Sequence, residues 1–363
     1  MRPFGTMVCG VLMTMSQDEY RHALASPGEY LESNEYPEVQ PPRFDITLDA
    51  WILTRYSDIS AAYKSSSLLL TGLGDKRPLK VPDEAEHEKM RAETLDALSP
   101  KNLERWSDLL ALEVEALLDK LSREKRIDLI KQYGKPLCLF LAAIVTGLTI
   151  EEAQHLAPQA REVSESVAEP CDATRKIRAK AAKVVLRNHF SSGPEALRDS
   201  GFVALSQTLP CLLGNAWFAL TRHKVQWELL HCEPTLGEQA IEELLRYAGL
   251  TRVLFRVAST DIDLNGLRIR KGTRLVLRII AGNRDQLYID NPNQLDIRRR
   301  GSGHLSLGMG HHACIGAGLI RMAMRQTTLP LVTRFEEVEV AEPVFWKGGS
   351  GFRSPQSLWV NLR

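Results

Sequence analysis

The chain has 363 residues, of which 44% are hydrophobic, and a formal net charge of +1 at pH 7. This is enough apolar material for a sizeable core, so extended disorder is excluded. A net charge so close to zero gives no reason to expect a nucleic-acid partner or binding to an acidic membrane surface. The 6 cysteines are scattered without the spacing of a disulfide framework, which is typical of a protein from a reducing cytoplasm.

The N-terminal stretch is mildly apolar, too short to span a bilayer, and lacks a clear cleavage site. We expect residues 1–15 to be a disordered extension, because MSQDEYRHAL from Met15 has the character of a natural beginning. The length of the chain allows two domains or one large domain, and no internal repeat or low-complexity run appears. A soluble cytoplasmic protein without a membrane partner is the resulting expectation.

The first predicted elements alternate between helix, hairpin and loop. Periodicity predicts a helix over Ser16–Ala25 and a second helix over Asp58–Ser65. Between them, Phe44–Leu48 and Ala50–Thr54 are predicted to be the two strands of a short hairpin. Leu68–Pro82 is rich in Gly and Pro and is predicted to be a loop.

A helix is then expected to begin at Asp83, a good N-cap followed by further acidic residues. His87 and Arg91 lie four residues apart and therefore share one helical face. Such a pair is usually part of a solvated, salt-bridged surface, but it can also hold a buried anion.

Long apolar-periodic stretches predict buried helices over Leu103–Leu121 and Ile127–Leu148, the second bent at Pro136, and a further helix over Glu151–Val167. The basic segment that follows, from Lys176 to Arg187, is expected to be a solvated helix face. Docking of an acidic redox partner is the alternative.

The segment Phe202–Leu230 is predicted to be a central helix interrupted by Pro210. Proline lacks the N–H that would bond to the carbonyl of Ser206, so we expect a kink that frees this carbonyl for a water or a polar group of a substrate. Thr208 could bond back to its own helix, as helical threonines often do.

The region after the central helix predicts an ion pair and then strands. Glu243 and Arg246 lie three residues apart on one helical face, an arrangement that contributes little when exposed. The following Thr251–Ile280 alternates apolar and polar residues around an Asn-Gly turn, so it is predicted to be rich in strands, with Arg256 on one of them.

The stretch His304–Arg321, HLSLGMGHHACIGAGLIR, combines glycine turns with a cysteine before an apolar helix. Glycines allow the backbone to approach a flat ligand closely. A helix N-terminus favours the thiolate of Cys314 over its thiol, and a thiolate is an axial ligand for haem iron. An inert buried cysteine is the common alternative. Zinc is disfavoured because His311, His312 and Cys314 have no matching second pair of ligands.

This stretch resembles the haem-binding signature of cytochromes P-450, F-G-x-G-x-[HR]-x-C-x-G-x-x-[LI]-[AG]-R, with Leu307 and Ile320 as its departures. The resemblance implies the cytochrome P-450 fold, mainly α with a small β region, as a single domain over residues 16–363. It also implies haem b (iron protoporphyrin IX) with Cys314 as the metal ligand. The remaining residues that it implies fall into two groups. The signature and haem-propionate contacts are Gly308, Gly316, His87, Arg91, Arg256, His304 and His312, and the structural E-x-x-R pair is Glu243 and Arg246.

The oxygen-activating motif A-G-x-[DE]-T-[TS] of that family aligns with ALSQTL, Ala204–Leu209. Thr208 matches, whereas Leu205 replaces the glycine and Gln207 replaces the acid. In the family this acid–alcohol pair supplies protons for dioxygen activation, so a neutral amide at Gln207 is expected to impair the usual relay.

Three functions remain open on this basis. The first is a monooxygenase of secondary metabolite biosynthesis that oxidises a small organic molecule with dioxygen and electrons from ferredoxin and ferredoxin reductase. The second is non-standard haem-thiolate chemistry: N–O cleavage with group transfer, dehydration or oxidative cyclisation. The third is a non-catalytic helper protein, against which the retained haem-binding motifs argue.

Overall fold

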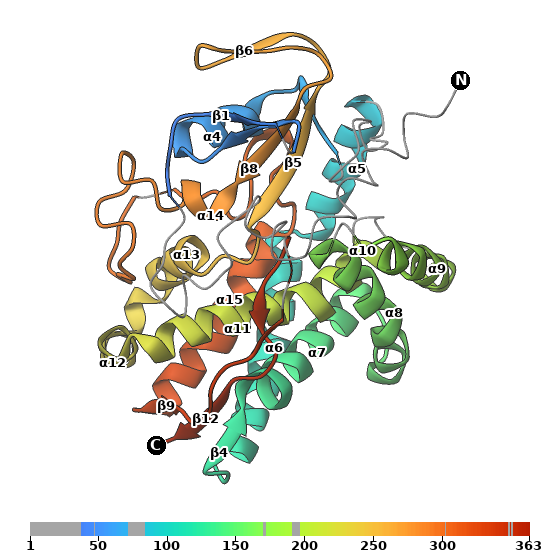
Figure 1. Cartoon of the computed structure of the whole chain (residues 1–363). Coiled ribbons are helices and arrows are strands. Elements are labelled where there is room, and N and C mark those ends of the chain that lie inside the picture. The colour runs from blue at the N-terminus through green and yellow to red at the C-terminus, as the bar shows by residue number, and fades with distance from the viewer. Residues whose placement is uncertain are drawn as a thin grey trace.

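A computed structural model of the chain describes residues 38–46, 48–71, 84–169, 172–190, 197–301, 303–347, 349 and 351–363 (Figure 1). The predicted N-terminal extension and the helix over Ser16–Ala25 lie outside these residues. Helices fill the lower part of the view in Figure 1 and a small sheet region lies above them, so the predicted mainly α class with a small β region is confirmed.

The upper region is built on a five-stranded sheet with the order β1-β2-β8-β5-β3. The predicted hairpin is confirmed as an antiparallel pair, and the second hairpin turn forms at Asn265 and Gly266, which both adopt positive φ. The first three residues of the predicted loop Leu68–Pro82 are instead a strand, because they pair with β5 at the sheet edge. The strands are β1 (Arg43–Asp45), β2 (Ala50–Leu53), β3 (Leu68–Leu70), β5 (Val253–Ala258) and β8 (Arg274–Arg278), with the separate pair β6 (Ile262–Leu264) and β7 (Leu267–Ile269).

The helical region contains the long predicted helices, with bounds that differ from the predictions by a few residues. In chain order, with the short α4 of the upper region first, the helices are α4 (Tyr56–Lys64), α5 (Glu84–Ala97), α6 (Pro100–Leu121), α7 (Lys135–Thr146), α8 (Ile150–Ala168), α9 (Ala173–His189), α10 (Asp199–Val203), α11 (Leu209–Arg222), α12 (Lys224–Cys232), α13 (Gly237–Tyr247), α14 (Ile279–Gly282) and α15 (Ala317–Arg334).

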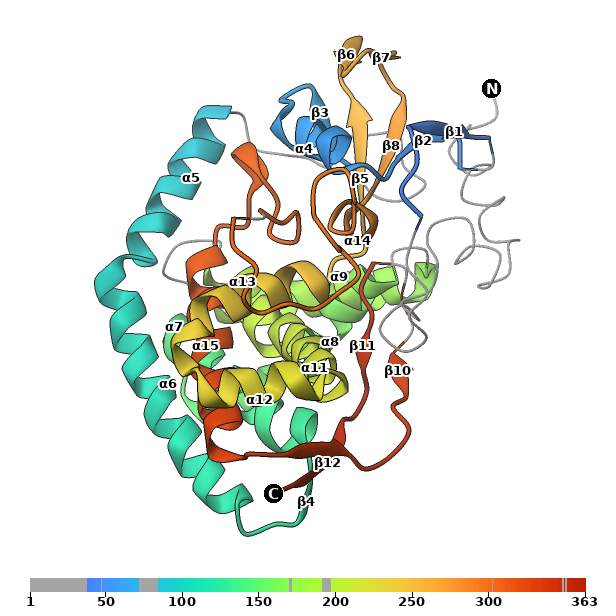
Figure 2. The ribbon, with the colours of Figure 1, turned by 90° about the vertical axis from the view of Figure 1, so that its left-hand side faces the viewer.

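Helix α11 lies at the centre of this region, with α6, α7, α12 and α15 around it (Figure 2). Its sequence, LPCLLGNAWFALTR, is apolar on almost every side, and a helix of that kind is stable only when it is surrounded by protein. Trp217 is fully buried, and its indole N–H donates to Thr328 Oγ1 at 3.1 Å. The core therefore anchors α11 directly against α15, the helix that follows Cys314.

The stretch predicted as one helix over Ile127–Leu148 is divided. It begins with β4 (Arg126–Asp128), continues as a π-helix over Leu129–Gly134, and only then becomes α7. The buried carboxylate of Asp128 explains the change, because it accepts hydrogen bonds from the backbone N–H groups of Ile130 and Lys131. Pro136 stands in the first turn of α7, where proline is tolerated, rather than at a bend within a helix.

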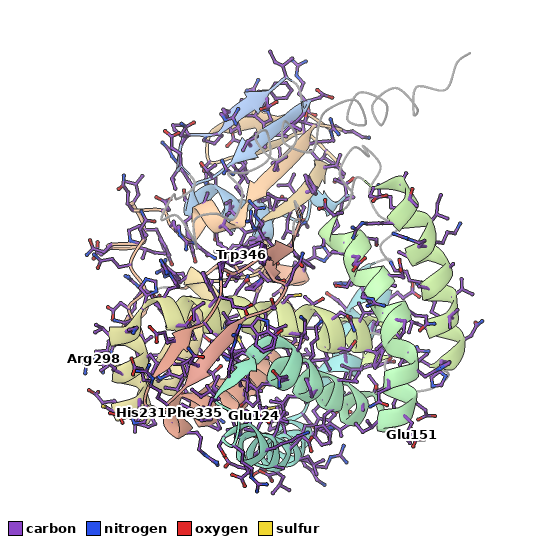
Figure 3. All side chains as sticks on the ribbon, turned by 60° about the horizontal axis from the view of Figure 1, so that its bottom comes forward. Glu124, Glu151, His231, Arg298, Phe335 and Trp346 are labelled. Carbon is purple, nitrogen blue, oxygen red and sulfur yellow. The ribbon has the colours of Figure 1, made fainter. Side chains whose placement is uncertain are left out.

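Two apolar stretches, Leu129–Thr146 and Asp199–Arg222, have the length and composition of membrane-spanning helices. In the structure 56% and 78% of these stretches is buried inside the protein, as expected for core helices of a globular fold. Figure 3 shows the same organisation from below, with Glu151 and Arg298 at the rim and Trp346 near the middle. The C-terminal strands close this side: β9 (Val338–Val340) and β4 flank β12 (Trp359–Leu362), and β10 (Trp346–Lys347) pairs with β11 (Ser354–Pro355).

Candidate active site

Two glycine turns hold the loop before Cys314. Gly308 and Gly310 adopt φ values of +70° and +67°, which L side chains rarely adopt. A Cβ atom at Gly310 would also lie 3.0 Å from the carbonyl oxygen of Tyr63. The backbone N–H of Cys314 donates to the carbonyl of Leu307 at 2.7 Å, so the loop returns on itself before the helix begins. The predicted need for glycine is therefore confirmed at both positions.

Gly316 has a different role, because its φ of −83° is open to any residue. It precedes the first residue of α15, and a Cβ atom placed there would meet nothing within 4 Å. A side chain at this position would therefore project into open space two residues after the cysteine, where a flat ligand could lie.

The thiol of Cys314 is partly buried just before α15. Burial raises its pKa, while a hydrogen bond from the Gly316 backbone and the charges of Arg321 and Arg91 lower it by less. The backbone N–H at the helix N-terminus therefore favours the thiolate, as predicted, but desolvation outweighs this contribution and the pKa of the thiol is raised in the protein alone. A bound metal ion reverses this balance, since coordination deprotonates a thiol outright.

Four cationic or ionisable side chains from distant parts of the chain gather beside this loop. The rings of His87 and His312 lie 5.3 Å apart between centroids, and Arg91 Nη1 donates to the carbonyl of Ala313 at 3.0 Å. Burial lowers the pKa of His312, and the charges of Arg256, His87, His311 and Arg91 lower it further. The structure therefore brings together the four predicted residues His87, Arg91, Arg256 and His312.

Arg256 is the most buried member of this cluster, with 2% of its surface exposed. Its guanidinium lies over the ring of Tyr63, 5.8 Å from the centroid, and donates to the carbonyl of Phe255. Burial lowers its pKa, because desolvation disfavours the charged form.

Among the described residues, no carboxylate lies within 4.0 Å of a basic group of the cluster His87, Arg91, Arg256 and His312. Arg256 is buried, and a buried cation without a counter-ion is costly, so the cluster fits an anion from outside the chain. The two propionates of a haem supply two carboxylates, and Cys314 lies on the same loop as His312. The residues present therefore fit a haem, with Cys314 as the iron ligand and the cluster as the propionate site.

His304, also predicted to contact a propionate, is turned to other partners. Its Nδ1 accepts a hydrogen bond from the Ser306 backbone at 3.2 Å, and its Nε2 lies 3.4 Å from Glu242 Oε2. Both ring nitrogens therefore face groups outside the cation cluster. The contacts of His304 give its predicted role no support.

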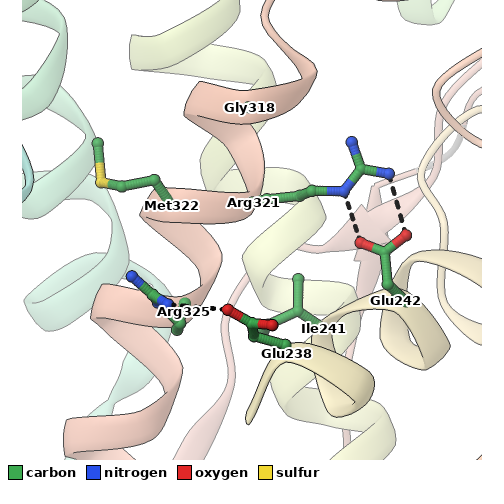
Figure 4. A pocket seen from close by; sticks show the side chains of 7 residues that line it. All are labelled: Glu238, Ile241, Glu242, Gly318, Arg321, Met322 and Arg325. Carbon is green, nitrogen blue, oxygen red and sulfur yellow. Dashed lines mark hydrogen bonds and ion pairs between the residues drawn. The ribbon is translucent and has the colours of Figure 1, made fainter. Parts of the chain in front are cut away.

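Glu242 joins His304 to the helix behind Cys314. Arg321 donates to it twice, from Nε at 2.5 Å and from Nη2 at 3.0 Å, across a groove of about 400 Å³ between α13 and α15 (Figure 4). Burial raises the pKa of Glu242, but the hydrogen bonds and charges of His304 and Arg321 outweigh it and hold the pKa at about 2. The sequence interpretation missed Glu242, although the arginine of the cysteine signature signalled a nearby acid.

Glu243 and Arg246 form a fully buried ion pair. Arg246 Nε and Nη2 each lie 2.7 Å from a carboxylate oxygen of Glu243. The guanidinium also donates to the carbonyls of Asn283, Pro292 and Gln294. Helix α13 is therefore fastened to the chain that leads into the cysteine loop, as predicted for the E-x-x-R pair.

Gln207 and Thr208 lie in a different element, a π-helix over Ala204–Thr208 between α10 and α11. The backbone N–H of Leu209 donates to the carbonyl of Ala204, five residues back, directly before Pro210. The helix therefore contains a π-turn directly before Pro210, a feature that often marks functional sites, whereas the predicted kink and the freed Ser206 carbonyl stay predictions. Whether this turn holds a water or a substrate group stays a prediction.

Some polar side chains in and next to the π-turn form hydrogen bonds within this part of the helix. Ser206 Oγ donates to the carbonyl of Phe202 at 2.7 Å, and Cys211 Sγ donates to the carbonyl of Gln207 at 3.3 Å. The amide of Gln207 has a long contact of 3.4 Å to Ser206 Oγ. None of the described residues forms a hydrogen bond with the Thr208 hydroxyl, so the alternative of a bond back to its own helix is not seen.

The predicted central helix also ends earlier than expected. It breaks at His223, where the backbone leaves the helical region, and α12 begins at Lys224. The His223 ring accounts for the break, since its Nδ1 is within 2.7 Å of the Ala219 carbonyl at the end of α11.

A cysteine presented by glycine turns before a long helix, with the buried Arg256 and further basic side chains beside it, is the arrangement expected of a haem-thiolate protein. Comparison with known proteins agrees: the profile described as "Cytochrome P450" matches residues 223–344. The polyketide biosynthesis cytochrome P450 PksS of Bacillus subtilis (strain 168) is 26% identical over 383 residues, covering 92% of this chain and 94% of that protein. The chain is therefore similar to cytochromes P450 over nearly its whole length, and these findings support an enzyme of that type.

Solved structures show the same fold. The LnmA cytochrome P450 hydroxylase from the leinamycin pathway of Streptomyces atroolivaceus S-140 has a TM-score of 0.74 at 27% identity, covering 86% of this chain and 90% of that one. P450BioI, solved in complex with an acyl carrier protein ligated to hexadec-9Z-enoic acid, has a TM-score of 0.79 at 23% identity, covering 95% and 96%. The predicted cytochrome P-450 fold is confirmed.

Proposed function

We propose that this protein is a cytoplasmic, single-domain monooxygenase that holds haem b and oxidises a small organic molecule of secondary metabolism. The observation that carries the proposal is the cluster of His87, Arg91, His312 and the buried Arg256, which lies next to Cys314 and has no carboxylate partner among the described residues. Haem b is the proposed form, because the sequence has no C-x-x-C-H motif for covalent attachment.

A cysteinate-ligated haem, when bound, activates dioxygen with two electrons and two protons, so that one oxygen atom enters the substrate and the other leaves as water. The chain's own residues hold and surround it. Cys314 would supply the ligand, the guanidinium groups of Arg91 and Arg256 would neutralise the propionates, and His87 and His312 would donate hydrogen bonds to them. Ferredoxin and ferredoxin reductase are the proposed electron donors.

On the substrate side, Gln207 and Thr208 are the proposed polar residues. The Thr208 hydroxyl can donate and accept, and the Gln207 amide can orient a water, but neither has an acidic proton near neutral pH. Protons must therefore arrive through water held at the π-turn. The buried Leu205 fills the position where the family motif has glycine.

This departure supports a second candidate function, non-standard haem-thiolate chemistry such as N–O cleavage with group transfer, dehydration or oxidative cyclisation. A substrate that brings its own leaving group does not need the usual acid–alcohol proton relay. The specific observation is Gln207 in the place of the acid, within a π-turn.

We further propose that the substrate is an acyl chain carried by an acyl carrier protein. Two similar proteins support this: PksS is named for polyketide biosynthesis, and P450BioI was solved with an acyl carrier protein that bears a fatty acid.

The absorption spectrum of the dithionite-reduced protein under carbon monoxide tests the haem assignment. We expect a strongly red-shifted Soret band, lost in Cys314→Ser and retained in the control Cys232→Ser, whose cysteine is exposed. A folded protein that binds no haem would contradict the proposal and favour a helper protein.

Gln207→Glu separates the two chemistries. If proton delivery limits a monooxygenase, the new carboxylic acid raises the product formed per dioxygen consumed. Unchanged coupling, or loss of the native product, would favour the non-standard chemistry.

A further inference from the structure

Helix α9 is strongly basic. Its sequence, ATRKIRAKAAKVVLRNH, contains lysines and arginines throughout and no Asp or Glu. Three arginines are neutralised by acids beside them: Arg175 lies 3.2 Å from Glu165, Arg178 lies 3.2 Å from Glu162, and Arg187 lies 3.4 Å from Asp199.

Lys176, Lys180 and Lys183 are different. All three are exposed, and none lies within 4.0 Å of a carboxylate among the described residues. Their spacing of four and three residues places them in one stripe along the helix. This stripe carries positive charge that the protein itself does not neutralise.

An apolar stripe runs beside the lysines. Ala179, Ala182 and Leu186 are buried and fix which side of α9 faces the protein. Ile177 and Val184 point away from that side, with 72% and 55% of their surface exposed, and the exposed Ala181 lies between them. Figure 1 shows α9 at the right-hand edge of the molecule, and the exposed fractions of Ile177 and Val184 show that this face is presented to solvent.

The position of α9 connects this face to the substrate side of the site. Helix α9 packs along α8 and contacts α10, and both of those helices contact the π-turn that carries Gln207 and Thr208. Cys314 and the cation cluster belong to other elements: the loop before α15, helix α5 and strand β5.

We infer that the outer face of α9, formed by Lys176, Lys180, Lys183, Ile177 and Val184, docks the acyl carrier protein that delivers the substrate. The inference rests on the proposed function. Acyl carrier proteins are small, acidic and helical, so their carboxylates would pair with the lysine stripe while apolar side chains cover Ile177 and Val184. An acidic ferredoxin fits the charge equally well, but it has no need to reach the π-turn.

Isothermal titration of the haem-loaded protein with hexadec-9Z-enoyl acyl carrier protein tests the inference. In the triple variant Lys176→Glu, Lys180→Glu and Lys183→Glu, we expect the Kd to rise at least about tenfold at low salt. Added salt should weaken binding of the wild type and have little effect on the variant. Ile177→Gln with Val184→Gln should also raise the Kd, without a change in the salt dependence.

The matched control is Lys101→Glu, Lys120→Glu and Lys125→Glu, an equal change of charge at exposed lysines on and after α6. An equal loss in this control would overturn the inference, because the effect would then be one of net charge. So would an unchanged Kd in the α9 variant, or a wild type that does not bind the acyl carrier protein.

Reduction by a [2Fe–2S] ferredoxin is measured with the same variants. If the α9 charges alter the rate of electron transfer and not carrier binding, the face belongs to the redox partner and the inference is wrong. Each variant should retain the normal carbon monoxide spectrum, which shows that its haem site is intact. A failure of the docking inference is then distinguishable from a failure of the haem assignment, which the Cys314→Ser experiment tests.

Discussion

At the scale of single residues, Cys314 shows how far a protein can prepare a metal ligand before the metal arrives. Glycine turns fix its position, yet burial raises the pKa of its thiol, so the unloaded site holds mostly thiol near neutral pH. The sequence pattern predicted the position and the ligand type. It could not predict the direction of the pKa shift, because desolvation depends on the folded surroundings.

This shift predicts slow alkylation of Cys314 in the haem-free protein. Only the thiolate reacts, so iodoacetamide should label Cys314 more slowly than the exposed Cys232 at pH 8, and the Cys314 rate should rise as the pH approaches its raised pKa. Peptide mass spectrometry measures both rates. In urea the two rates should converge; a fast Cys314 in the folded protein would show that its thiolate is favoured instead.

Arg256 is the residue whose loss should most weaken the propionate site, since it is almost fully buried. Arg256→Gln should speed haem transfer to apomyoglobin about tenfold, because hydrogen bonds to charged groups contribute about 1.5–3 kcal/mol. The matched control is Arg268→Gln on β7, an exposed residue of the same sheet region. Equal haem-loss rates in wild type and Arg256→Gln would place the propionates elsewhere.

At the scale of elements, the predictable features are those with a local cause. Apolar periodicity located α6, α8 and α11, and the Asn-Gly pair located a hairpin turn. The sequence predicted a kink at Pro210 but not the π-turn before it. The missing N–H of proline shows that one helical hydrogen bond is lost, but it does not show which backbone hydrogen bonds form in its place. Strand β3 was missed because its cause is non-local: it exists through pairing with β5.

The Glu243–Arg246 pair is expected to stabilise α13 and the chain from Asn283 to Arg299 together. Glu243→Gln leaves the Arg246 guanidinium buried and uncompensated, which should lower the free energy of unfolding by about 3–5 kcal/mol. Urea unfolding followed by tryptophan fluorescence measures the loss. The control Glu238→Gln removes an exposed carboxylate of the same helix and should change the free energy of unfolding by less than about 0.5 kcal/mol. Similar losses of unfolding free energy in the two variants would refute a special role for the buried pair.

At the scale of the whole molecule, the cation cluster links haem binding to folding. His87 and Arg91 come from α5, Arg256 from β5 and His312 from the cysteine loop, so residues separated by more than half of the chain meet only in the folded state. Sequence order showed that these motifs are present. That they converge, and that His304 turns toward Glu242 instead, follows from packing between distant segments, which no local pattern records.

The positive charges of this cluster repel one another when no anion is bound. The haem-free protein should therefore be less stable than the loaded one, and added anions should raise its Tm by more. Haem at about a thousand times its Kd contributes about 4 kcal/mol, so its removal should lower Tm by about 5 °C for a chain of this size. Sodium sulfate should then raise the Tm of the haem-free protein by more than that of the loaded protein, since sulfate can occupy the propionate site as well as acting as a general stabiliser. Scanning calorimetry of both forms gives the difference, and Arg91→Gln with Arg256→Gln should abolish it. An equal sulfate effect on both forms would mean that these side chains do not act as one anion site.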